Sequence, residues 1–267
     1  MQFKYNNFFK TKHHFKQSYY FSSIKKEPVL KFKTKGLKNS GGRNNLGVIT
    51  SFHKGGGHKQ LYRLINFSLM NDFVGVVMSI EYDPNRTANI AAIYCEEKKQ
   101  YFYVIAPKGL KKGNFIRSGS QALTRLGHNL TLDKIPLGSF IHNVSYTKLK
   151  GTISRAAGAF SQLLEKTVTH GIIKVNSGRH LSISLKNKAS LGKVSNENFW
   201  LKKKRKAGQS RWLNIRPTVR GVAMNPIDHP HGGGEGKSSK KMAPRTPWGK
   251  LVKQGSTRKS KKNKFML

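Results

Sequence analysis

Apolar and polar side chains alternate with a period of two residues in the middle of the chain, which is the pattern of β-strands that bury one face. The alternation is strict in residues 181–185, where serines separate the apolar side chains. Two longer runs, 74–83 and 90–107, are rich in Val, Ile, Tyr and Phe. The polar residues 96–100 interrupt the second run as a hairpin turn would. The pattern therefore predicts strands in this region.

A second hairpin is predicted farther along the chain. Residues 170–176 and 181–186 flank Ser177-Gly178-Arg179, which is a turn sequence. Residues 154–164 fit either a helical turn or a strand, and the pattern does not decide between them. Short strands with closely spaced turns indicate small barrels and not a parallel sheet covered by helices. A break near residues 124–129 divides the pattern into two β-modules of similar size.

The charge of the chain indicates what kind of partner it binds. The chain carries 51 Lys and Arg against 11 Asp and Glu, a formal net charge of +40. A compact globule with this charge repels itself unless a partner neutralises it, and a phosphate polymer suits this role because each contact releases a condensed counterion. A basic membrane binder would show a helix with a large apolar face, and none is evident. The apolar runs are also too short to cross a bilayer. The predicted partner is nucleic acid, and no membrane is expected.

The charge is concentrated at the two ends. Residues 1–43 have a net charge of +10 and residues 198–267 one of +17, whereas the much longer segment 44–197 has +13. Such ends cannot bury enough apolar surface to offset the entropy of ordering. We expect them to be disordered alone and to fold against RNA.

Two glycine-rich segments stand out in the basic regions. The first comprises residues 41–45 and 54–59. Glycine permits positive φ and close approach, so that successive N–H groups can form a concave anion site, with Arg43, Lys54, His58 and Lys59 supplying charge. A flexible surface loop is the alternative. The second segment, residues 216–237, contains three prolines and five glycines and is predicted to be an extended loop with a specific path.

The second segment favours an ordered RNA contact over three enzymatic interpretations. Asp228, His229 and His231 could share a metal, but third and fourth ligands are not evident. Gly236-Lys237-Ser238 resembles the end of a phosphate-binding loop, but the motif needs glycine where His231 stands. A nucleophile–His–Asp catalyst needs a rigid scaffold, which a glycine-rich loop does not offer. Cys95, the single cysteine, excludes a disulfide within the chain and is expected to be a packed thiol.

Two basic runs and three tryptophans lie toward the C-terminus. Residues 202–206 and 258–264 are basic runs that would neutralise phosphates, or else form a localisation signal or an unspecific tail. Trp200, Trp212 and Trp248 lie in or beside this region, where they could stack on bases or sugars or could pack within the protein.

The sequence resembles the large-subunit ribosomal protein L2 family of the bacterial and organellar type. The similarity covers residues 40–264 in order, and it is carried by segments 40–45, 55–60, 81–86, 106–110, 136–144, 216–237 and 246–249. The resemblance implies a mainly β fold, with an oligonucleotide-binding-fold barrel followed by an SH3-like barrel, between long basic extensions. The expected divisions are residues 1–43 for the N-terminal extension, 44–125 and 126–203 for the barrels, and 204–267 for the C-terminal extension.

The resemblance also implies a function. Members of the family bind large-subunit ribosomal RNA, support subunit association and tRNA placement, and help to build the peptidyl transferase region, where RNA performs the chemistry. By position, Arg86 and Arg155 resemble RNA-contacting arginines of the two barrels, and His229 resembles the loop histidine nearest the catalytic RNA. The full set of candidate RNA-binding residues is Arg43, Lys54, His58, Lys59, Arg86, Arg155, Arg211, Arg216, Arg220, Asn225, His229, His231, Lys237 and Trp248.

Further expectations concern partners and location. The expected partners are the RNA, neighbouring ribosomal proteins and the small subunit; we expect no small-molecule substrate, no catalytic residue and no cofactor beyond magnesium ions associated with the RNA. A histone-like condenser and a metal-dependent hydrolase are the competing functions. Ser68-Leu69-Met70 stands where the family has basic residues, which puts one RNA contact in doubt.

The composition bears on location. Lys outnumbers Arg 38 to 13, and Asn, Phe and Ile are plentiful, as an AT-rich genome would give. We therefore expect a mitochondrial ribosome in the matrix, with a plastid second and the cytoplasm of an AT-rich bacterium third. A transit peptide is conceivable because Glu27 is the first acidic residue, although such peptides favour Arg and Ser.

Overall fold

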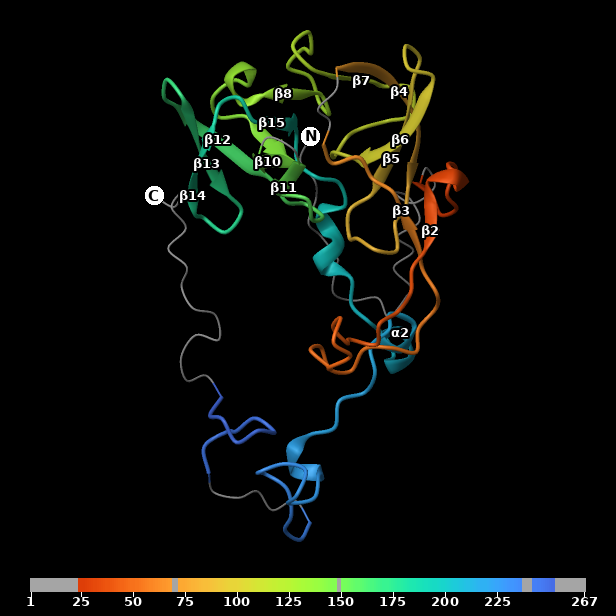
Figure 1. Ribbon diagram of the computed structural model, residues 1–267, viewed down its shortest axis with the longest axis vertical. Coiled ribbons are helices and arrows are strands. Elements are labelled where there is room, and N and C mark those ends of the chain that lie inside the picture. The colour runs from red at the N-terminus through yellow and green to blue at the C-terminus, as the bar shows by residue number, and fades with distance from the viewer. Residues whose placement is uncertain (1–23, 69–71, 148–149, 237–241, 253–267) are drawn as a thin grey trace, which may run out of the picture.

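Strands form two neighbouring modules in the computed structural model, which describes residues 24–68, 72–147, 150–236 and 242–252. Figure 1 shows the modules side by side, with a long C-terminal segment extending away from them. The mainly β class predicted from the alternating pattern is confirmed. One sheet runs through both modules in the order β14-β13-β12-β9-β15-β8-β7-β4-β5-β6.

The first module is an antiparallel arrangement built around β4. Its strands are β4 (Phe73–Glu81), β5 (Ile90–Cys95), β6 (Gln100–Ile105) and β7 (Phe115–Ser118). Strand β4 pairs with β5 on one side and β7 on the other, and β5 pairs with β6 across the predicted turn. Alternate residues of β4 are buried, and Cys95 lies in the resulting core as the predicted packed thiol.

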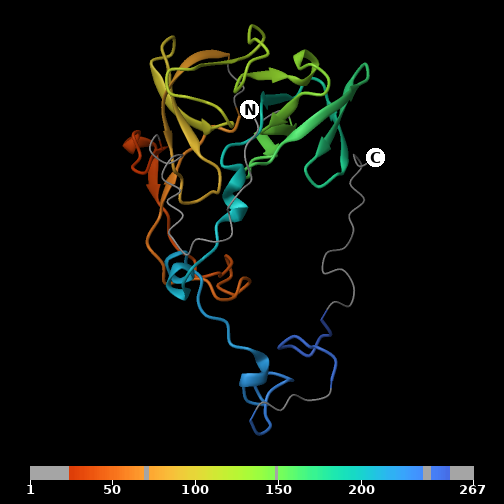
Figure 2. The same ribbon diagram turned by 180° about the vertical axis from the view of Figure 1, so that it is seen from behind.

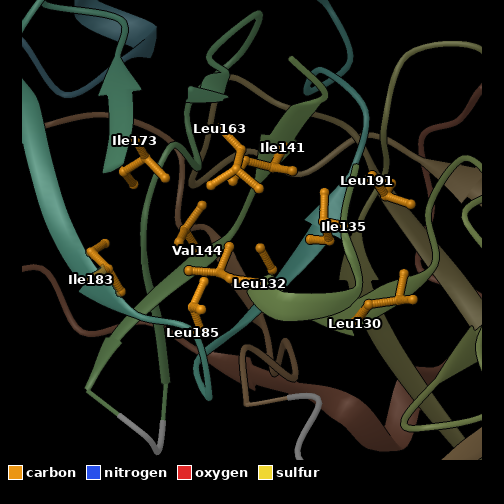
Figure 3. Close-up of a cluster of buried hydrophobic side chains, with 11 residues drawn as sticks. Leu130, Leu132, Ile135, Ile141, Val144, Leu163, Ile173, Ile183, Leu185 and Leu191 are labelled. Carbon is orange, nitrogen blue, oxygen red and sulfur yellow. The ribbon is translucent and has the colours of Figure 1, made fainter. Parts of the chain in front are cut away.

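The second module encloses the larger core. Its elements are β8 (Asn129–Thr131), η2 (Leu132–Lys134), β9 (Phe140–His142), β10 (Val144–Thr147), β11 (Lys150–Ile153), β12 (Ser161–Lys166), β13 (His170–Val175), β14 (His180–Ser184) and β15 (Lys188–Leu191). Strands β13 and β14 form the predicted hairpin. In the undecided segment 154–164, residues 154–160 form bends and turns, and residues 161–164 belong to β12. Figure 3 shows Leu, Ile and Val side chains from these elements meeting in the core.

Hydrogen bonds that main-chain carbonyls accept hold the modules against each other. Strands β7 and β8 make a short parallel contact between Ser118 and Asn129. The Lys108 N–H donates to the Lys193 carbonyl at 2.7 Å, and the side-chain amide of Asn196 donates to the Thr87 carbonyl at 2.6 Å. Because these bonds link residues far apart in the sequence, they fix how the two modules face each other.

Part of the predicted N-terminal extension lies on the first module. The short strand β1 (Ile24–Lys25) pairs with β4, 3-10 helix η1 (Lys31–Lys33) follows, and β2 (Thr34–Gly36) pairs with β3 (Leu61–Arg63). Leu30 is buried between them, and its N–H donates to the Tyr103 hydroxyl at 3.0 Å. Tyr103 in turn donates to buried Glu81 at 2.9 Å, and burial raises the pKa of Tyr103 well above its usual value.

The C-terminal segment contains little regular structure. It begins with η3 (Glu197–Leu201), continues through α2 (Ala207–Trp212) and η4 (Gly221–Ala223), and ends its described part at residue 252. The view from behind in Figure 2 shows the segment passing α2 and then leaving both modules. In the described part of the chain, no helix is long and apolar enough to cross a membrane.

Acid is expected to destabilise the second module because His142 is buried there in its neutral form. This side chain is fully buried, with Nδ1 2.9 Å from the Gly192 carbonyl, and burial lowers the pKa of His142 from 6.5 to about 4. The unfolded chain therefore binds a proton between these values that the folded chain does not. The free energy of unfolding is therefore unaffected by protonation of this side chain above pH 6.5. It decreases by roughly 2–3 kcal/mol as the pH falls from 6.5 toward 4.

Denaturant unfolding of the free chain at about pH 7.5 and pH 4.5 measures this effect. His142→Asn keeps a donor toward Gly192 but does not titrate, so the difference between the two pH values should shrink in that variant. His180→Asn, at an exposed position, is the matched control and should behave as the parent. If the free energy of unfolding of His142→Asn changes between the two pH values as much as that of the parent, protonation of His142 is not the cause of the loss of stability.

Candidate RNA-binding surface

The first glycine-rich segment pairs with the chain that follows α2. We call residues 41–59 and 211–216 the glycine junction. The Gly55 N–H donates to the Asn214 carbonyl at 2.9 Å, and the Gly57 N–H donates to Asn214 Oδ1 at 2.6 Å. Asn214 has a φ of 63°, which turns its carbonyl and its amide toward the same loop. The first glycine-rich segment and the basic C-terminal end of the chain therefore meet in one structure.

Cationic side chains cover the glycine junction. The Arg216 guanidinium lies so close to Gly55 that a Cβ there would be 3.2 Å from Nη2, and Arg211 lies similarly near Gly56. Six predicted RNA-binding residues are exposed here, namely Arg43, Lys54, His58, Lys59, Arg211 and Arg216. None of them has an ion-pair partner among the residues that the structure describes. Six predicted RNA-binding residues thus share one uncompensated surface.

Replacing Gly57 by alanine is expected to open the glycine junction. A Cβ at this position would lie 2.2 Å from Asn214 Oδ1 and 2.7 Å from the Asn214 nitrogen, a contact that requires the main chain to move. Affinity for large-subunit RNA should fall about tenfold because the cations from the two ends lose their common arrangement. Gly208→Ala is the matched control, since a Cβ there meets nothing within 4 Å. Equal RNA affinities of the two variants would contradict a role for the junction.

A second group of predicted residues meets at Phe67, between the modules. The guanidinium carbons of Arg86 and Arg155 lie 5.5 and 4.6 Å from the centre of the Phe67 ring, and Lys150 Nζ lies 5.6 Å from it. The Phe67 carbonyl accepts hydrogen bonds from the Gly151 N–H and the Asn143 side chain. Arginines predicted for separate barrels therefore form one site, because a single ring lies against both.

Buried Asp83 fixes the position of Arg86. The Arg86 Nε donates to Asp83 Oδ2 at 2.6 Å, and Asp83 Oδ1 accepts the Asn85 N–H at 2.9 Å. Sequence reasoning missed the roles of Phe67, Asp83 and Lys150. Of the departure at Ser68-Leu69-Met70, residues 69 and 70 lie outside the described part of the chain.

The proline- and glycine-rich loop has a defined path around His229. The imidazole is buried against Gly221, where a Cβ would come within 2.5 Å of the ring. The His231 N–H donates to His229 Nδ1 at 3.0 Å, and the rings of the two histidines stack with centroids 5.2 Å apart. Because Nδ1 accepts this bond, the proton of the neutral ring is on Nε2, which is available as a donor.

The other predicted residues of this loop differ in their exposure and contacts. Arg220 and Asn225 are exposed, whereas His231 Nε2 accepts the Arg245 N–H at 2.8 Å. Among the described residues, no group of three or more His, Cys, Asp or Glu is placed to hold a metal. Lys237 lies outside the described residues, as does the basic run 258–264.

Aromatic side chains remain accessible in the C-terminal segment. Trp248 is 67% exposed, and its ring centroid lies 5.5 Å from that of Phe52 in the glycine junction. Trp200 and Trp212 are also exposed, with Lys206 Nζ 5.1 Å from the Trp212 ring centre. Trp248 thus packs against Phe52 and keeps an open face, and its stacking on RNA stays a prediction.

Comparison with known proteins decides the family. A model described as "Ribosomal Proteins L2, RNA binding N-terminal domain" matches residues 31–118, and one described as "Ribosomal Proteins L2, C-terminal domain" matches residues 125–249. The chain belongs to the ribosomal protein L2 family. The first of these models covers the first β-module, and the second covers the second β-module together with most of the described C-terminal segment. The two modules fit an oligonucleotide-binding-fold barrel followed by an SH3-like barrel.

Relatives of this L2 chain extend over nearly its whole length. It is 46% identical over 241 residues to the large ribosomal subunit protein uL2 of Wolbachia sp. subsp. Drosophila simulans, covering 90% of this chain and 88% of the relative. It is 49% identical over 243 residues to uL2 of Alcanivorax borkumensis, covering 90% and 86%. It is 47% identical over 249 residues to uL2 of Rickettsia massiliae, covering 92% of this chain and 91% of the relative. These relatives are bacterial, so the L2 type is bacterial.

Proposed function

We propose that the protein is a structural constituent of a large ribosomal subunit and binds its RNA. The observation that carries this proposal is the glycine junction, where basic side chains of residues 43–59 and of residues 211–216 lie exposed on a defined main-chain framework. Phosphates are the complementary partner, because they neutralise these side chains and accept hydrogen bonds from their fork-shaped or ammonium donors. A histone-like condenser would share the charge but would not need this framework.

Competition between RNAs tests the proposal. Labelled large-subunit RNA is bound to the full chain and then challenged with unlabelled large-subunit RNA, small-subunit RNA or duplex DNA. A structural constituent of the large subunit should be displaced only by the first competitor at equal concentration. If the three competitors displace the label equally, the protein is an unspecific condenser.

The Phe67 site orients the two modules on the RNA in this proposal. Arg86 and Arg155 present planar guanidinium groups from both modules toward the same RNA segment, and each keeps unused N–H donors. Because Asp83 and Phe67 already hold Arg86 in place, less side-chain entropy is lost on binding. This arrangement favours one orientation of the two modules on the RNA.

His229 positions RNA in this proposal and transfers no proton. The His231 N–H supplies the orienting partner for its imidazole, and Asp228 is an unlikely partner because neighbours in an extended chain point to opposite sides. His229→Gln can still accept the His231 N–H through its side-chain oxygen, and it does not titrate near neutrality. We expect subunits with this variant to assemble less well, and the fully assembled fraction to form peptide bonds with the parent's pH dependence.

Isolating that fraction and measuring the chemical step across pH checks the expectation. Loss of a titration near neutrality, with assembly intact, would make His229 a catalyst and not a positioning residue. In our proposal the protein has no catalytic residue, and the only metal ions near it are magnesium ions associated with the RNA.

The extended loop carries the finer part of the proposal. It reaches away from both barrels, and Ile227 on it is 93% exposed, so the loop can enter RNA while the barrels remain outside. We propose that it helps to build the peptidyl transferase region and supports tRNA placement and subunit association, with neighbouring ribosomal proteins and the small subunit as partners. Large subunits that lack residues 219–236 should then associate more weakly with small subunits.

The location proposed from composition is a mitochondrial ribosome in the matrix. It is supported by the excess of Lys over Arg and the abundance of Asn, Phe and Ile. A plastid and a bacterial cytoplasm are the alternatives, and the relatives described above are bacterial. Cell fractionation followed by immunodetection separates the three, since the protein should accompany a mitochondrial matrix marker.

A further inference from the structure

A cavity of about 460 Å³ opens on the second module beside Arg155. Its volume lies within the roughly 300–1,000 Å³ range of sites that enclose small ligands. The floor consists of Ile153, Val175 and Leu181, which are half buried and pack against the core of the module. A planar apolar group of ligand size could therefore be covered on one face by aliphatic side chains.

Two arginines and polar side chains form the rim of the cavity. Arg179 and Ser177 belong to the exposed turn between β13 and β14, together with Asn176. Arg155 lies on the side that faces Phe67. No acidic residue lines the cavity, and neither arginine forms an ion pair within the described ranges of the chain. The rim thus favours an anionic ligand.

Arg155 is held in place before any ligand arrives. Its Nη1 donates to the Gly151 carbonyl at 3.2 Å, and its guanidinium carbon lies 4.6 Å from the centre of the Phe67 ring. The remaining N–H groups stay available. A fixed guanidinium loses little entropy when it meets a phosphate or stacks on a base, so the contact contributes more to affinity.

We propose that this cavity receives one unpaired nucleotide of the RNA, with the base on the apolar floor and the phosphate between Arg155 and Arg179. Unpaired bases can leave the stack, and proteins hold them through stacking and through contacts to their polar edges. The amide of Asn176 has both donors and acceptors for such an edge. An apolar side chain of another protein would fit the floor but would leave the two arginines without counter-charge. The inference rests on the proposed RNA binding and deepens it.

Filling the cavity tests the proposal with the full chain and large-subunit RNA. Ser177→Trp places a ring at the rim without changing charge, and Val168→Trp, at a position that is 97% exposed and away from the cavity, is the matched control. Ser177→Trp should lower RNA affinity about tenfold, whereas Val168→Trp should not change it. Chemical probing of base edges in the complex should show one unpaired base that the parent protects and Ser177→Trp leaves reactive.

A second variant distinguishes the loss of contacts at the cavity from a general effect on folding. Arg179→Lys keeps the charge but loses the fork-shaped donor, and it should expose the same base while other protections persist. If both variants bind RNA with the parent's affinity and protections, the cavity holds no nucleotide. If Ser177→Trp binds RNA normally but fails to enter large subunits, a protein side chain occupies the cavity and the inference is wrong. Failure of the parent chain to bind RNA at all would instead contradict the proposed function.

Discussion

Raising the salt concentration from about 50 to 200 mM is expected to lower the affinity of the protein for its RNA about a thousandfold to a hundred-thousandfold, as for six to ten phosphate contacts. Five Lys and Arg side chains of the glycine junction, together with Arg86 and Arg155 at Phe67, give a number of cationic groups within this range. Each phosphate neutralised releases counterions, and the logarithm of affinity should fall by about 0.7–0.9 per contact for each tenfold rise in salt.

A charge-matched comparison locates the contacts. Lys54, Lys59 and Arg216 are changed together to glutamine in one variant, and Lys99, Lys111 and Lys112 in another; all six side chains are exposed. The first variant should have a salt slope that is shallower by about 2–3, whereas the second should keep the parent's slope. If both variants change the slope equally, binding depends on net charge alone and the junction is not a specific surface.

Replacing Asp83 by alanine is expected to lower the free energy of unfolding by about 3 kcal/mol, because Arg86 then loses its partner in a largely buried position. RNA affinity should fall as well, even though the variant is more positively charged, since the guanidinium loses its fixed position beside Phe67. Denaturant unfolding and RNA titration measure the two effects.

Two further variants complete this test. Glu97→Ala removes a carboxylate at an exposed turn, so stability should hardly change and RNA affinity should not fall. Asp83→Asn keeps the shape and part of the hydrogen bonding and should lie between Asp83→Ala and the parent. Should Asp83→Ala bind RNA more tightly than the parent, charge would outweigh the positioning of Arg86.

The strands could be predicted because their signal is local. The alternation at 181–185 and the turn Ser177-Gly178-Arg179 reproduce the pairing of β13 with β14, since a period of two and a turn sequence lie within one short window. The resemblance supplied the order of the two barrels. The boundary between the N-terminal extension and the first barrel, at residues 43 and 44, stays a prediction. Strand β1 and Leu30, which precede it, already lie on the first module.

The geometry of the candidate site depends on contacts that no local window contains. Gly57 and Asn214 are 157 positions apart, and Phe67, Arg86 and Arg155 meet only because the two modules pack against each other. The residue types were visible as basic and glycine-rich segments, but their grouping was not. The orienting partner of His229 escaped sequence reasoning because it is a main-chain N–H, which every residue except proline carries.

Sedimentation of the protein in a cell lysate tests the central claim most directly. Ribosomes are separated into subunits at low magnesium concentration on a sucrose gradient, and the protein is detected by antibody in each fraction. The account predicts that it migrates with the large-subunit RNA and stays there when the small subunit is removed. Migration with free protein at the top of the gradient, or with the small subunit or DNA, would contradict the account.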